Sequence, residues 1–481
     1  MATETVQAAD HELLIGGERV ASGEWSEVRS PYDGAIVGRV ATADAELVER
    51  SIGVAQEAFE AEEFHQHERA AVLGRAAELV AEREDELTVT IAAEAGKPLK
   101  TARVEAQRCV NTLTFAAVEA RKLTGETVPM AASATGTGKT GIVLRLPYGV
   151  VGAITPFNFP LNLVAHKLGP ALAAGNAVVL KPAGQTPISA IKLAEILVEA
   201  GVPDGWLNVT CGSGSEIGGV LVGDDRVRAI TFTGSAAVGW GIRADAARKK
   251  VTLELGSTAP LIVHEDGDWE AAADAANLHA YSHAGQSCIS IQRILLHDAV
   301  ADAFTERFVS NVESLTVGEP LDEDTDVGPL ISTGDRDRVK DWIDEAASGG
   351  AEVLIGGELT DEDRCLEPTV IQEPSREAKV WCEEIFGPVA TVNTFSSFDE
   401  AIEMANDAKY GLQAGIFTRD LGLALEAGGR LEFGGVLVNE VPTFRADQMP
   451  YGGVKDSGNT REGPAYAIRE LTEERFVSLQ G

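Results

Sequence analysis

The sequence predicts an α/β protein whose central part is a parallel, nucleotide-binding sheet. From Pro147 to Leu255, short runs rich in β-branched residues alternate with segments that carry apolar residues at helical spacing. The expected strands are 149–155, 176–180, 207–210, 229–232 and 251–255, and the expected helices are 163–174, 187–200, 216–222 and 236–247. This alternation is typical of βαβ units, in which ligands bind at the carboxyl ends of the strands.

The segments that flank this sheet have other patterns. Residues 13–17 and 35–40 predict short strands, and the Ala-, Glu- and Leu-rich segments 45–59, 68–83 and 102–121 predict helices. After Gly256 a second α/β segment runs to about Val438, with a helix near 270–283 and a strand at 293–296. Because no repeat or low-complexity linker separates these parts, we expect one compact body.

The charge balance excludes several classes of partner. The 481 residues include 75 acidic and 40 basic side chains, which give a net charge of −35. Such a chain repels nucleic acid and anionic membrane surfaces, so neither is expected as a partner. The acidic residues are scattered rather than gathered in a tail, and this distribution suits a halophilic protein, because salt screens the repulsion between them.

Cysteine usage and the amino-terminal segment indicate a cytoplasmic protein. The chain has five cysteines. They form no CxxC pair, so neither a disulfide framework nor a metal site is expected. Residues 1–10 are polar and lack a targeting signal, and no apolar run approaches the roughly 18 residues of a membrane span.

Two glycine-rich stretches resemble phosphate-binding motifs without matching them. Residues 133–140 read SATGTGKT, but Ser133 stands where a P-loop has its first glycine, and no clear strand precedes the segment. Residues 212–218 have the spacing GxGxxxG rather than GxGxxG. We expect a flexible turn at the first stretch and a tight βα turn at the second.

Three side chains have the chemistry that acyl transfer requires. Cys288 lies among small and polar residues in GQSCIS, Glu254 ends an apolar strand, and Asn158 follows a strand within PFNFP. A thiolate can attack a carbonyl, a buried carboxylate can act as a general base, and an amide can donate to an oxyanion. The structural alternatives are a buried thiol, an ion-paired glutamate and a turn asparagine.

Two strand ends are candidates for binding a nucleotide. Thr233-Gly234-Ser235 opens the helix expected at 236–247, and free amides at a helix N-terminus can hold a pyrophosphate. Lys181 closes another strand, where its cation can reach a ribose or phosphate. The alternatives are a helix cap and a solvated lysine.

Together these residues resemble the aldehyde dehydrogenase superfamily over nearly the whole chain. The matching segments are PFNFP at Pro156, KPAGQTP at Lys181, FTGS at Phe232, ELG at Glu254, GQSC at Gly285, EEIFGPV at Glu383 and PYGGVKDSG at Pro450. Their order is that of the family, which makes the resemblance very specific.

The resemblance implies the following catalytic roles. Cys288 attacks the aldehyde to form a thiohemiacetal, and Asn158 with the Cys288 backbone N–H stabilises the oxyanion. Hydride transfer leaves a thioester, and Glu254 activates the water that hydrolyses it. Lys167 and Glu462 match family positions with supporting roles.

The resemblance also implies a set of cofactor contacts. Lys181 contacts the adenine ribose, Ser235 the pyrophosphate, Glu384 the nicotinamide ribose, and Phe386 packs near the nicotinamide. The remaining expected contacts are Thr155, Phe157, Gly184, Thr233, Gly234 and Leu255.

One departure from the family pattern bears on the choice of cofactor. Many NAD-preferring members have a glutamate at the third position after this lysine, where this chain has Gly184. Without that carboxylate a 2′-phosphate is not repelled, so we favour NADP over NAD. At a second departure, Ser257 replaces a glycine after ELG, and only a local packing change is expected.

By resemblance the fold has a Rossmann-type cofactor domain (1–122 and 146–256), an α/β catalytic domain (257–448) and a small oligomerisation element (123–145 and 465–481). The tail at 475–479 reads as a strand that needs an edge to pair with. A homodimer or homotetramer is therefore expected.

Two other functions and the substrate remain open. A CoA-acylating semialdehyde dehydrogenase of the superfamily typically lacks the glutamate of ELG, and a non-catalytic member would lack the nucleophile; this chain has both residues.

Our hypothesis for the substrate is a short polar aldehyde, such as lactaldehyde, glyceraldehyde or a semialdehyde. Ser287, Arg108 and Arg445 are candidate substrate contacts, with a structural ion pair as the alternative for each arginine. Ser287, where an arginine would be expected, disfavours a phosphorylated glyceraldehyde.

Overall fold

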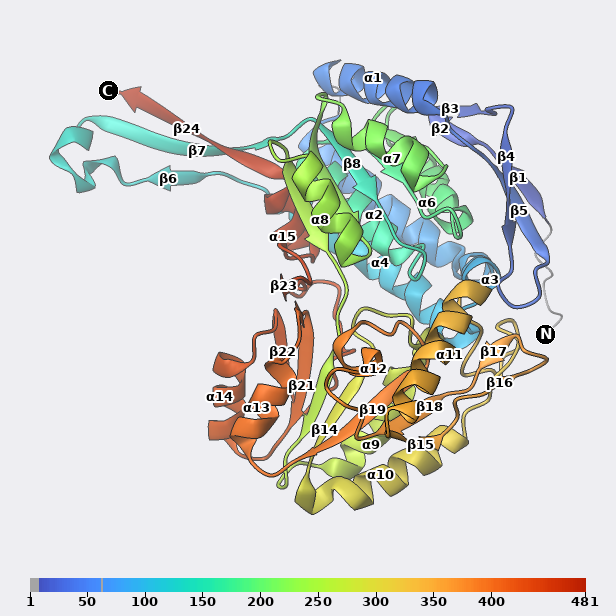
Figure 1. Ribbon diagram of the computed structural model, residues 1–481. Coiled ribbons are helices and arrows are strands. Elements are labelled where there is room, and N and C mark those ends of the chain that lie inside the picture. The colour runs from blue at the N-terminus through green and yellow to red at the C-terminus, as the bar shows by residue number, and fades with distance from the viewer. Residues whose placement is uncertain (1–7, 62–63) are drawn as a thin grey trace.

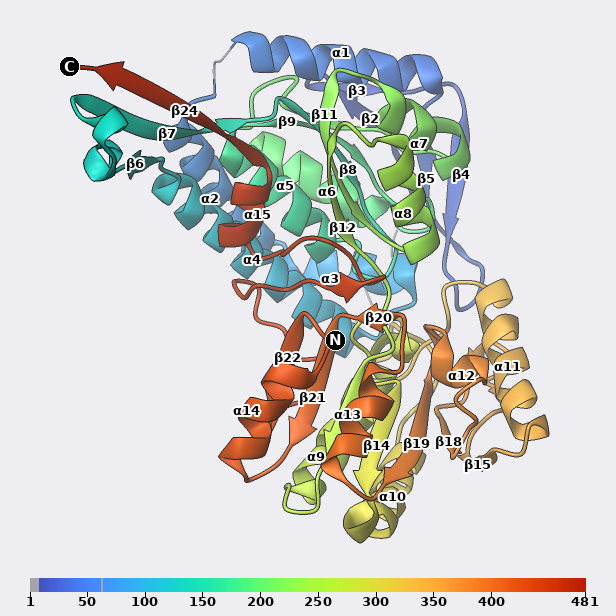
Figure 2. The same cartoon turned by 60° about the vertical axis from the view of Figure 1, so that its left-hand side comes forward.

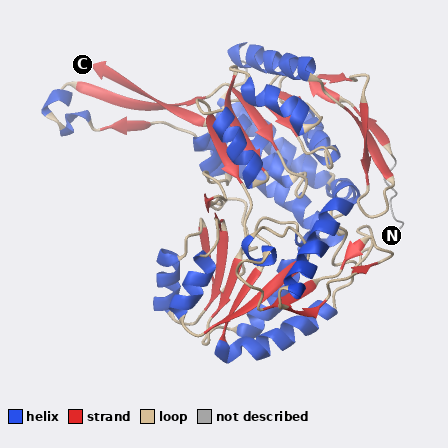
Figure 3. Ribbon diagram, in the orientation of Figure 1, coloured by secondary structure: helices blue, strands red, loops and turns tan. Residues whose placement is uncertain are grey.

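Two seven-stranded sheets, one above the other in Figure 1, form the body of the computed structural model. The structure describes residues 8–61 and 64–481, so the first seven residues of the expected amino-terminal segment lie outside it. In both sheets, helices cover the two faces (Figure 3). The expected α/β class is therefore confirmed.

The upper sheet has a parallel core that matches the expected nucleotide-binding pattern. Its strand order is β12 (Lys250–Glu254), β11 (Val227–Thr233), β8 (Val150–Ile154), β9 (Ala177–Lys181), β10 (Leu207–Val209), β2 (Leu13–Ile15) and β3 (Glu18–Val20). The first five strands pair in parallel. The sequence pattern did not reveal that β2 and β3, far away in sequence, extend this sheet in antiparallel fashion.

Helices pack on both faces of the upper sheet, because its strands are buried on both sides. One layer holds α1 (Ala45–Ala61), α7 (Gly214–Gly223) and α8 (Ala236–Asp245). The other holds α2 (Gln66–Glu82), α3 (Glu84–Ala95), α4 (Leu99–Lys122), α5 (Asn162–Ala174) and α6 (Ile188–Glu199). These layers lie on opposite sides of the strands in Figure 2.

The lower sheet is also mostly parallel. Its order is β15 (Glu352–Ile355), β18 (Thr369–Gln372), β19 (Val389–Phe395), β14 (Arg293–His297), β13 (Pro260–Val263), β21 (Gln413–Phe417) and β22 (Gly435–Val438). Along β13, Leu261 and Val263 belong to one hydrophobic core and Ile262 to another. The alternation of a strand thus divides the interior into two cores.

The helices of the lower sheet divide between these two cores. One core packs under α9 (Trp269–Tyr281), α10 (Asp298–Glu313), α11 (Thr333–Ser348) and the short α12 (Lys379–Cys382). The other packs under α13 (Phe398–Asn406) and α14 (Leu421–Arg430).

Four smaller sheets complete the fold of the described residues. The amino-terminal one joins β1 (Ala9–His11), β5 (Ile36–Ala41) and β4 (Trp25–Arg29). Two-stranded pairs join β16 (Leu359–Thr360) to β17 (Cys365–Leu366), and β20 (Tyr410–Gly411) to β23 (Val454–Lys455).

An antiparallel sheet projects from the upper body as an arm, with the C-terminus at its tip (Figure 1). It consists of β6 (Glu126–Val128), β7 (Lys139–Pro147) and β24 (Thr472–Gln480), with the 3₁₀ turns η1 (Met130–Ala132) and η2 (Ala134–Gly136). The tail does find a strand edge, since β24 pairs along the full length of β7. The preceding helix α15 (Pro464–Glu470) packs mainly on α4 and α5.

The two glycine-rich stretches are turns, as expected. Residues 133–140 run from η2 into β7, and residues 212–218 comprise the end of the turn between β10 and α7 and the first residues of α7. The sequence pattern missed α3, because it follows α2 with only Arg83 between them and contains β-branched residues. No helix in the described part of the chain is long and apolar enough to cross a membrane.

Candidate active site

The carboxyl ends of the upper parallel strands bring most of the predicted residues to one edge. Ile154 of β8 pairs with Lys181 of β9, and Thr233 of β11 pairs with Glu254 of β12. Thr155, Phe157 and Asn158 follow β8 directly. The edge faces the lower body, so that the site is built between the two sheets.

The loop that carries Cys288 lies before β14 of the lower sheet. It begins in the 3₁₀ turn η3 (Ser282–Gly285), where His283 and Ala284 both have the left-handed value φ 52°. The side chain of Gln286 anchors it, since its Oε1 accepts a hydrogen bond from Ile331 N at 2.9 Å. Asn158 Nδ2 donates to Gln286 O at 2.9 Å and ties this loop to the end of β8. The strained loop is thus held from both sheets.

Cys288 is partly buried, and its sulfur has a partner that the sequence did not predict. Burial raises the pKa of the Cys288 thiol to about 12, and the hydroxyl of Tyr451 lies 2.9 Å from Sγ. All five cysteines are free. The backbone N–H of Cys288 donates to no acceptor in the described chain, so it is available to an oxyanion.

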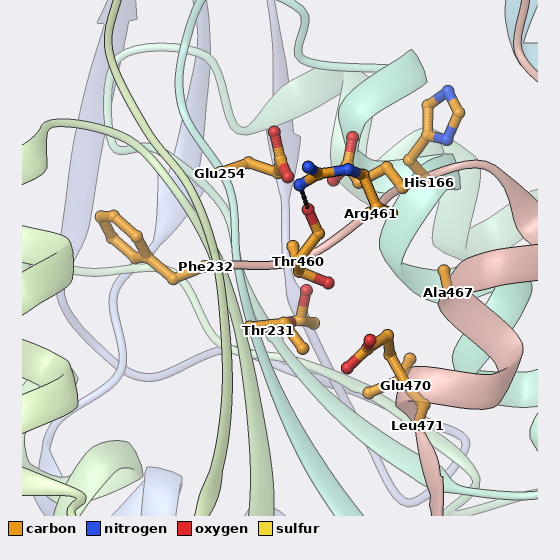
Figure 4. Close-up of a pocket in the computed structure, with 11 residues that line it drawn as sticks. His166, Thr231, Phe232, Glu254, Thr460, Arg461, Ala467, Glu470 and Leu471 are labelled. Atoms are coloured by element: carbon orange, nitrogen blue, oxygen red, sulfur yellow. Dashed lines mark hydrogen bonds between the residues drawn. The ribbon is translucent and has the colours of Figure 1, made fainter. Parts of the chain in front are cut away.

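Glu254 is buried at the end of β12 with neither carboxylate oxygen hydrogen-bonded within the described residues. Burial, reinforced by the charge of Glu462, raises its pKa well above the usual value. A Cβ at Gly452 would lie 2.7 Å from Oε1, so only glycine leaves room for this carboxylate. Glu254 borders a small cavity that His166 and Arg461 also line (Figure 4). The ion-paired glutamate considered as an alternative is not what the structure shows.

Lys167 and Glu462 lie together behind this carboxylate. Lys167 Nζ donates to Glu462 Oε1 at 3.4 Å and to Thr231 Oγ1 at 3.2 Å. Burial lowers the pKa of Lys167. Burial also opposes the charge of Glu462, but Lys167 and Arg445 outweigh it and lower the pKa of Glu462 to about 2. Glu462 is therefore ionised, whereas the neighbouring Glu254 holds its proton more tightly.

Both arginines that were candidate substrate contacts are engaged by carboxylates. Arg445 Nη2 donates to Glu462 Oε2 at 2.8 Å, and its side chain is only 6 % exposed. Arg108 donates to Asp447 Oδ1 from Nε at 3.1 Å and from Nη2 at 2.9 Å. These ion pairs are the structural alternative that the sequence left open for both arginines.

The nucleotide-facing strand ends have open donors and open space. Ser235 is the exposed N-cap residue of α8, and its hydroxyl makes no capping hydrogen bond. Thr233 Oγ1 is buried without a partner among residues 8–61 and 64–481, and the N–H of Gly234 donates to Glu254 O at 3.1 Å. Within the same residues, Lys181 Nζ donates only to the carbonyl of Pro182, at 3.3 Å. Gly184 is exposed, and a Cβ there would meet no atom within 4 Å.

The other end of a nicotinamide nucleotide would meet Glu384 and Phe386. Glu384 Oε1 accepts a hydrogen bond from Ser257 N at 2.9 Å, and a Cβ at Gly256 would lie 2.4 Å from its Oε2. Burial raises the pKa of Glu384 to about 7. Phe386 has φ 51° and packs edge-on against Phe157 at 5.8 Å between ring centroids.

These residues fit a nicotinamide cofactor. An unused N-cap hydroxyl, the orphaned Thr233 hydroxyl and the open space at Gly184 lie at the nucleotide edge of the sheet. The backbone N–H of Ser257 orients Glu384, as that of a glycine would, so the local packing change expected at Ser257 stays a prediction. Ser287 and Glu384 line the same cavity, and Leu255 is buried with its N–H donated to Ser457 O at 3.0 Å.

A mostly parallel sheet whose carboxyl edge faces a loop that carries a thiol is an arrangement suited to a nucleotide-dependent oxidoreductase. Comparison with known proteins gives the family: the model of the aldehyde dehydrogenase family matches residues 19–477. The chain belongs to this family and is an NAD(P)-dependent aldehyde oxidoreductase.

The chain resembles characterised members of that family over nearly its whole length. It is 43 % identical over 477 residues to 3-sulfolactaldehyde dehydrogenase of Priestia aryabhattai, covering 99 % of both chains. Aldehyde dehydrogenase 21 of Physcomitrella patens, solved with the product succinate, superposes with a TM-score of 0.95 at 38 % identity and 99 % coverage of both chains. Glyceraldehyde-3-phosphate dehydrogenase GapN of Methanocaldococcus jannaschii, solved with NADP, gives 0.90 at 37 % identity, covering 95 % of this chain and 99 % of that one.

Proposed function

We propose that this enzyme oxidises a short, polar aldehyde to its carboxylic acid, with Cys288 as nucleophile, Glu254 as general base and NADP as the favoured cofactor. The observation that carries the proposal is the free backbone N–H of Cys288 beside a thiol that the loop holds between the two sheets. A buried structural thiol would need neither this strained loop nor a vacant donor.

The first step is addition of the Cys288 thiolate to the carbonyl carbon. As the C–S bond forms, the carbonyl electrons move to oxygen, and the Cys288 N–H stabilises the resulting charge. Asn158 Nδ2 has two hydrogens, of which Gln286 O accepts one, so the second is free for the same oxygen. Thr155 and Phe157 precede Asn158 and place it at the strand end.

When bound, the cofactor supplies the acceptor for the hydride that leaves the carbonyl carbon. Lys181, Thr233, Gly234 and Ser235 would hold its nucleotide end, while Glu384, Phe386, Phe157 and Leu255 would border its nicotinamide end. The sulfur then carries a thioester.

Glu254 completes the reaction by taking a proton from water, which attacks the thioester and releases Cys288 as thiolate. A carboxylate with a raised pKa is a stronger base than an ordinary one, and Glu254 has no hydrogen bond within the described chain to hold it away from water. Lys167 and Glu462 set the charge next to it. A CoA-acylating enzyme has no use for such a base, and a non-catalytic relative has no use for the free thiol.

NADP is favoured because no carboxylate stands at position 184. The neighbouring Lys181 gives a cation where an additional phosphate would lie, and the open space at Gly184 leaves room for it. Structural neighbours were solved with NADP and with NAD, so they support a nicotinamide cofactor, and the choice of NADP rests on position 184.

The substrate class rests on the relatives and on the polar site. The substrates and products for which the similar proteins are named are short and polar: 3-sulfolactaldehyde, glyceraldehyde-3-phosphate and succinate. Ser287 borders the cavity next to Glu384 and can contact such a substrate. Arg108 and Arg445, each paired with a carboxylate, stabilise the site, and direct substrate contact by either is the weaker assignment.

The substrate class is tested by the rate of cofactor reduction with a panel of aldehydes. Three-carbon hydroxyaldehydes and short semialdehydes should give higher kcat/KM than hexanal or benzaldehyde, without CoA and in molar salt. Clearly higher kcat/KM for the long or aromatic aldehydes would overturn this part of the proposal.

We also propose a soluble, cytoplasmic homo-oligomer adapted to high salt. The proposed domains keep the bounds that the sequence predicts: 1–122 with 146–256 for the cofactor, 257–448 for catalysis, and 123–145 with 465–481 for assembly. The net charge of −35 makes repulsion large at low ionic strength. The unfolding temperature should therefore rise with potassium chloride, and a flat response would count against the adaptation.

A further inference from the structure

The hydroxyl of Tyr451 lies on the sulfur of Cys288. The two atoms are 2.9 Å apart, and Tyr451 is 2 % exposed. In the chain that the structure describes, this hydroxyl is the only hydrogen-bond partner of Sγ. A phenol can donate to sulfur or accept from it, so its role depends on which group keeps its proton.

Glu462 holds Tyr451 in place through both backbone and side chain. Its N–H donates to Tyr451 O at 2.6 Å, and Tyr451 N donates to Glu462 O at 3.2 Å. Its carboxylate binds Arg445, whose guanidinium lies 3.8 Å from the centroid of the Tyr451 ring. The stacked cation and the paired backbone leave the phenol little freedom to turn away from the sulfur.

The backbone after Tyr451 is equally restricted. A Cβ at Gly452 would lie 2.1 Å from Thr460 O as well as 2.7 Å from Glu254 Oε1. The same glycine therefore lets the segment of Tyr451 approach both Thr460 and Glu254 closely. The close packing at Gly452 thus restricts the backbone next to Tyr451 on the side that faces Glu254.

The protonation states identify the donor. Burial raises the pKa of Tyr451 well above its usual value, whereas the hydrogen bond from Tyr451 lowers the pKa of the Cys288 thiol, and both effects favour the phenol as the donor. The thiol faces Glu384 and Glu254, whose charges raise its pKa, and Arg445, whose charge lowers it. Because burial and the two nearby carboxylates disfavour a negative charge on sulfur, the thiolate needs a hydrogen-bond donor that stabilises it.

We propose that Tyr451 is a catalytic residue whose hydroxyl donates a hydrogen bond to the Cys288 thiolate and so increases the fraction of reactive sulfur. The proposal rests on the proposed role of Cys288 as nucleophile. The phenol transfers no proton: the hydrogen bond weakens as the sulfur lone pair enters the new C–S bond, and it forms again when the thioester is cleaved.

The test is the pH dependence of Cys288 alkylation by iodoacetamide in the full-length enzyme, without aldehyde or cofactor. Mass spectrometry of the Cys288 peptide separates it from the other cysteines. Tyr451→Phe keeps the ring under Arg445 and removes only the donor. Tyr281→Phe is the matched control, since it removes another buried hydroxyl, one that donates to Thr369 O at 3.0 Å away from the sulfur.

In Tyr451→Phe the midpoint of the alkylation profile should rise by about one pH unit, a tenfold lower thiolate fraction below the midpoint. Part of this is offset by the greater nucleophilicity of the more basic thiolate, so alkylation at neutral pH should slow by about threefold. Tyr281→Phe should leave the profile unchanged. An unchanged or lowered midpoint in Tyr451→Phe would overturn the proposal, the latter by showing that the phenol accepts from the thiol.

If Tyr451→Phe does not fold, 3-fluorotyrosine incorporated at position 451 provides a second test. The more acidic phenol is a stronger donor of nearly the same size, so the midpoint should fall. A midpoint that stays or rises contradicts the proposal. Neither alkylation measurement uses aldehyde turnover, so both test the hydrogen bond alone. Failure of the proposed nucleophilic role of Cys288 would be seen in a separate experiment, as aldehyde turnover that survives in Cys288→Ala.

Discussion

The side-chain amide of Asn158 donates a hydrogen bond of 2.9 Å to the backbone carbonyl of Gln286, two residues before Cys288. This contact joins the end of β8 in the upper sheet to the nucleophile loop of the lower sheet. The same amide nitrogen keeps one hydrogen that this contact does not use. Asn158 thus positions the loop, and in the proposed mechanism its second hydrogen is donated to the substrate oxygen.

Replacing Asn158 with alanine should lower kcat by about 10²- to 10³-fold, the usual cost of one oxyanion donor. Steady-state kinetics with a short aldehyde would place the loss in kcat, with KM changed little, because the charge on oxygen develops only after attack. A loss confined to KM would assign Asn158 to substrate binding instead.

Glu254→Gln should stop turnover after the first hydride transfer. The glutamine cannot take a proton from water, so we expect a burst of about one reduced cofactor per active site followed by little turnover. Rapid mixing with absorbance detection would measure the burst. Steady turnover at the wild-type rate would remove Glu254 from the hydrolytic step.

The pH dependence of kcat follows from the raised pKa of Glu254. Only the deprotonated carboxylate acts as a base, and burial shifts its formation to higher pH. The hydrolytic rate should therefore rise with pH through this raised pKa, not near pH 4.5. In Glu254→Gln the residual rate should lose that rise, and a profile identical to that of the wild type would contradict the assignment.

Gly184→Glu should shift the enzyme from NADP toward NAD. The added side chain enters open space, so the fold is retained, while the carboxylate repels a 2′-phosphate. We expect kcat/KM for NADP to fall by about tenfold or more relative to that for NAD. Gly428→Glu, another exposed glycine with open space but on α14, is the matched control and should leave the ratio unchanged.

The arm sheet should carry the assembly interface. Register places Ile142, Leu144, Val477 and Leu479 on one face, where Leu144 is 40 % and Leu479 is 53 % exposed. A double Leu144→Glu/Leu479→Glu variant should dissociate the oligomer, as light scattering after size exclusion would show. Leu421→Glu, at an exposed leucine on α14, should not change the mass. An unchanged mass for the double variant would show that the assembly interface does not depend on these two leucines.

Sequence patterns predicted the strands of the upper core well because they are short apolar runs between turn residues. The expected strand 229–232 is β11, Val227–Thr233, and the expected strand 251–255 is β12, Lys250–Glu254. By contrast, β2 pairs with β10 although Leu14 and Val209, the paired residues, lie far apart in the sequence. Local patterns do not report such pairing, since it depends on long-range geometry.

The site was predictable to the extent that its motifs are local. Cys288, Glu254 and Asn158 each stand in a recognisable segment, and the structure brings their segments to one junction. Tyr451 lies in the PYGGVKDSG segment, but nothing in that pattern shows a phenol on the sulfur. Likewise, the sequence does not predict the ion pair between Arg445 and Glu462, because it forms only through the folding of the loop between these residues.

The central claim, a hydrolytic thioester mechanism at Cys288, is tested most directly by reduced-cofactor absorbance with a short polar aldehyde and no CoA. Wild type and Cys288→Ala are compared in molar salt with NADP⁺ and NAD⁺ in parallel. We expect continuous turnover in the wild type that disappears in Cys288→Ala while its unfolding temperature is retained. Turnover that persists in Cys288→Ala, or a wild type that turns over only when CoA is added, would contradict the account.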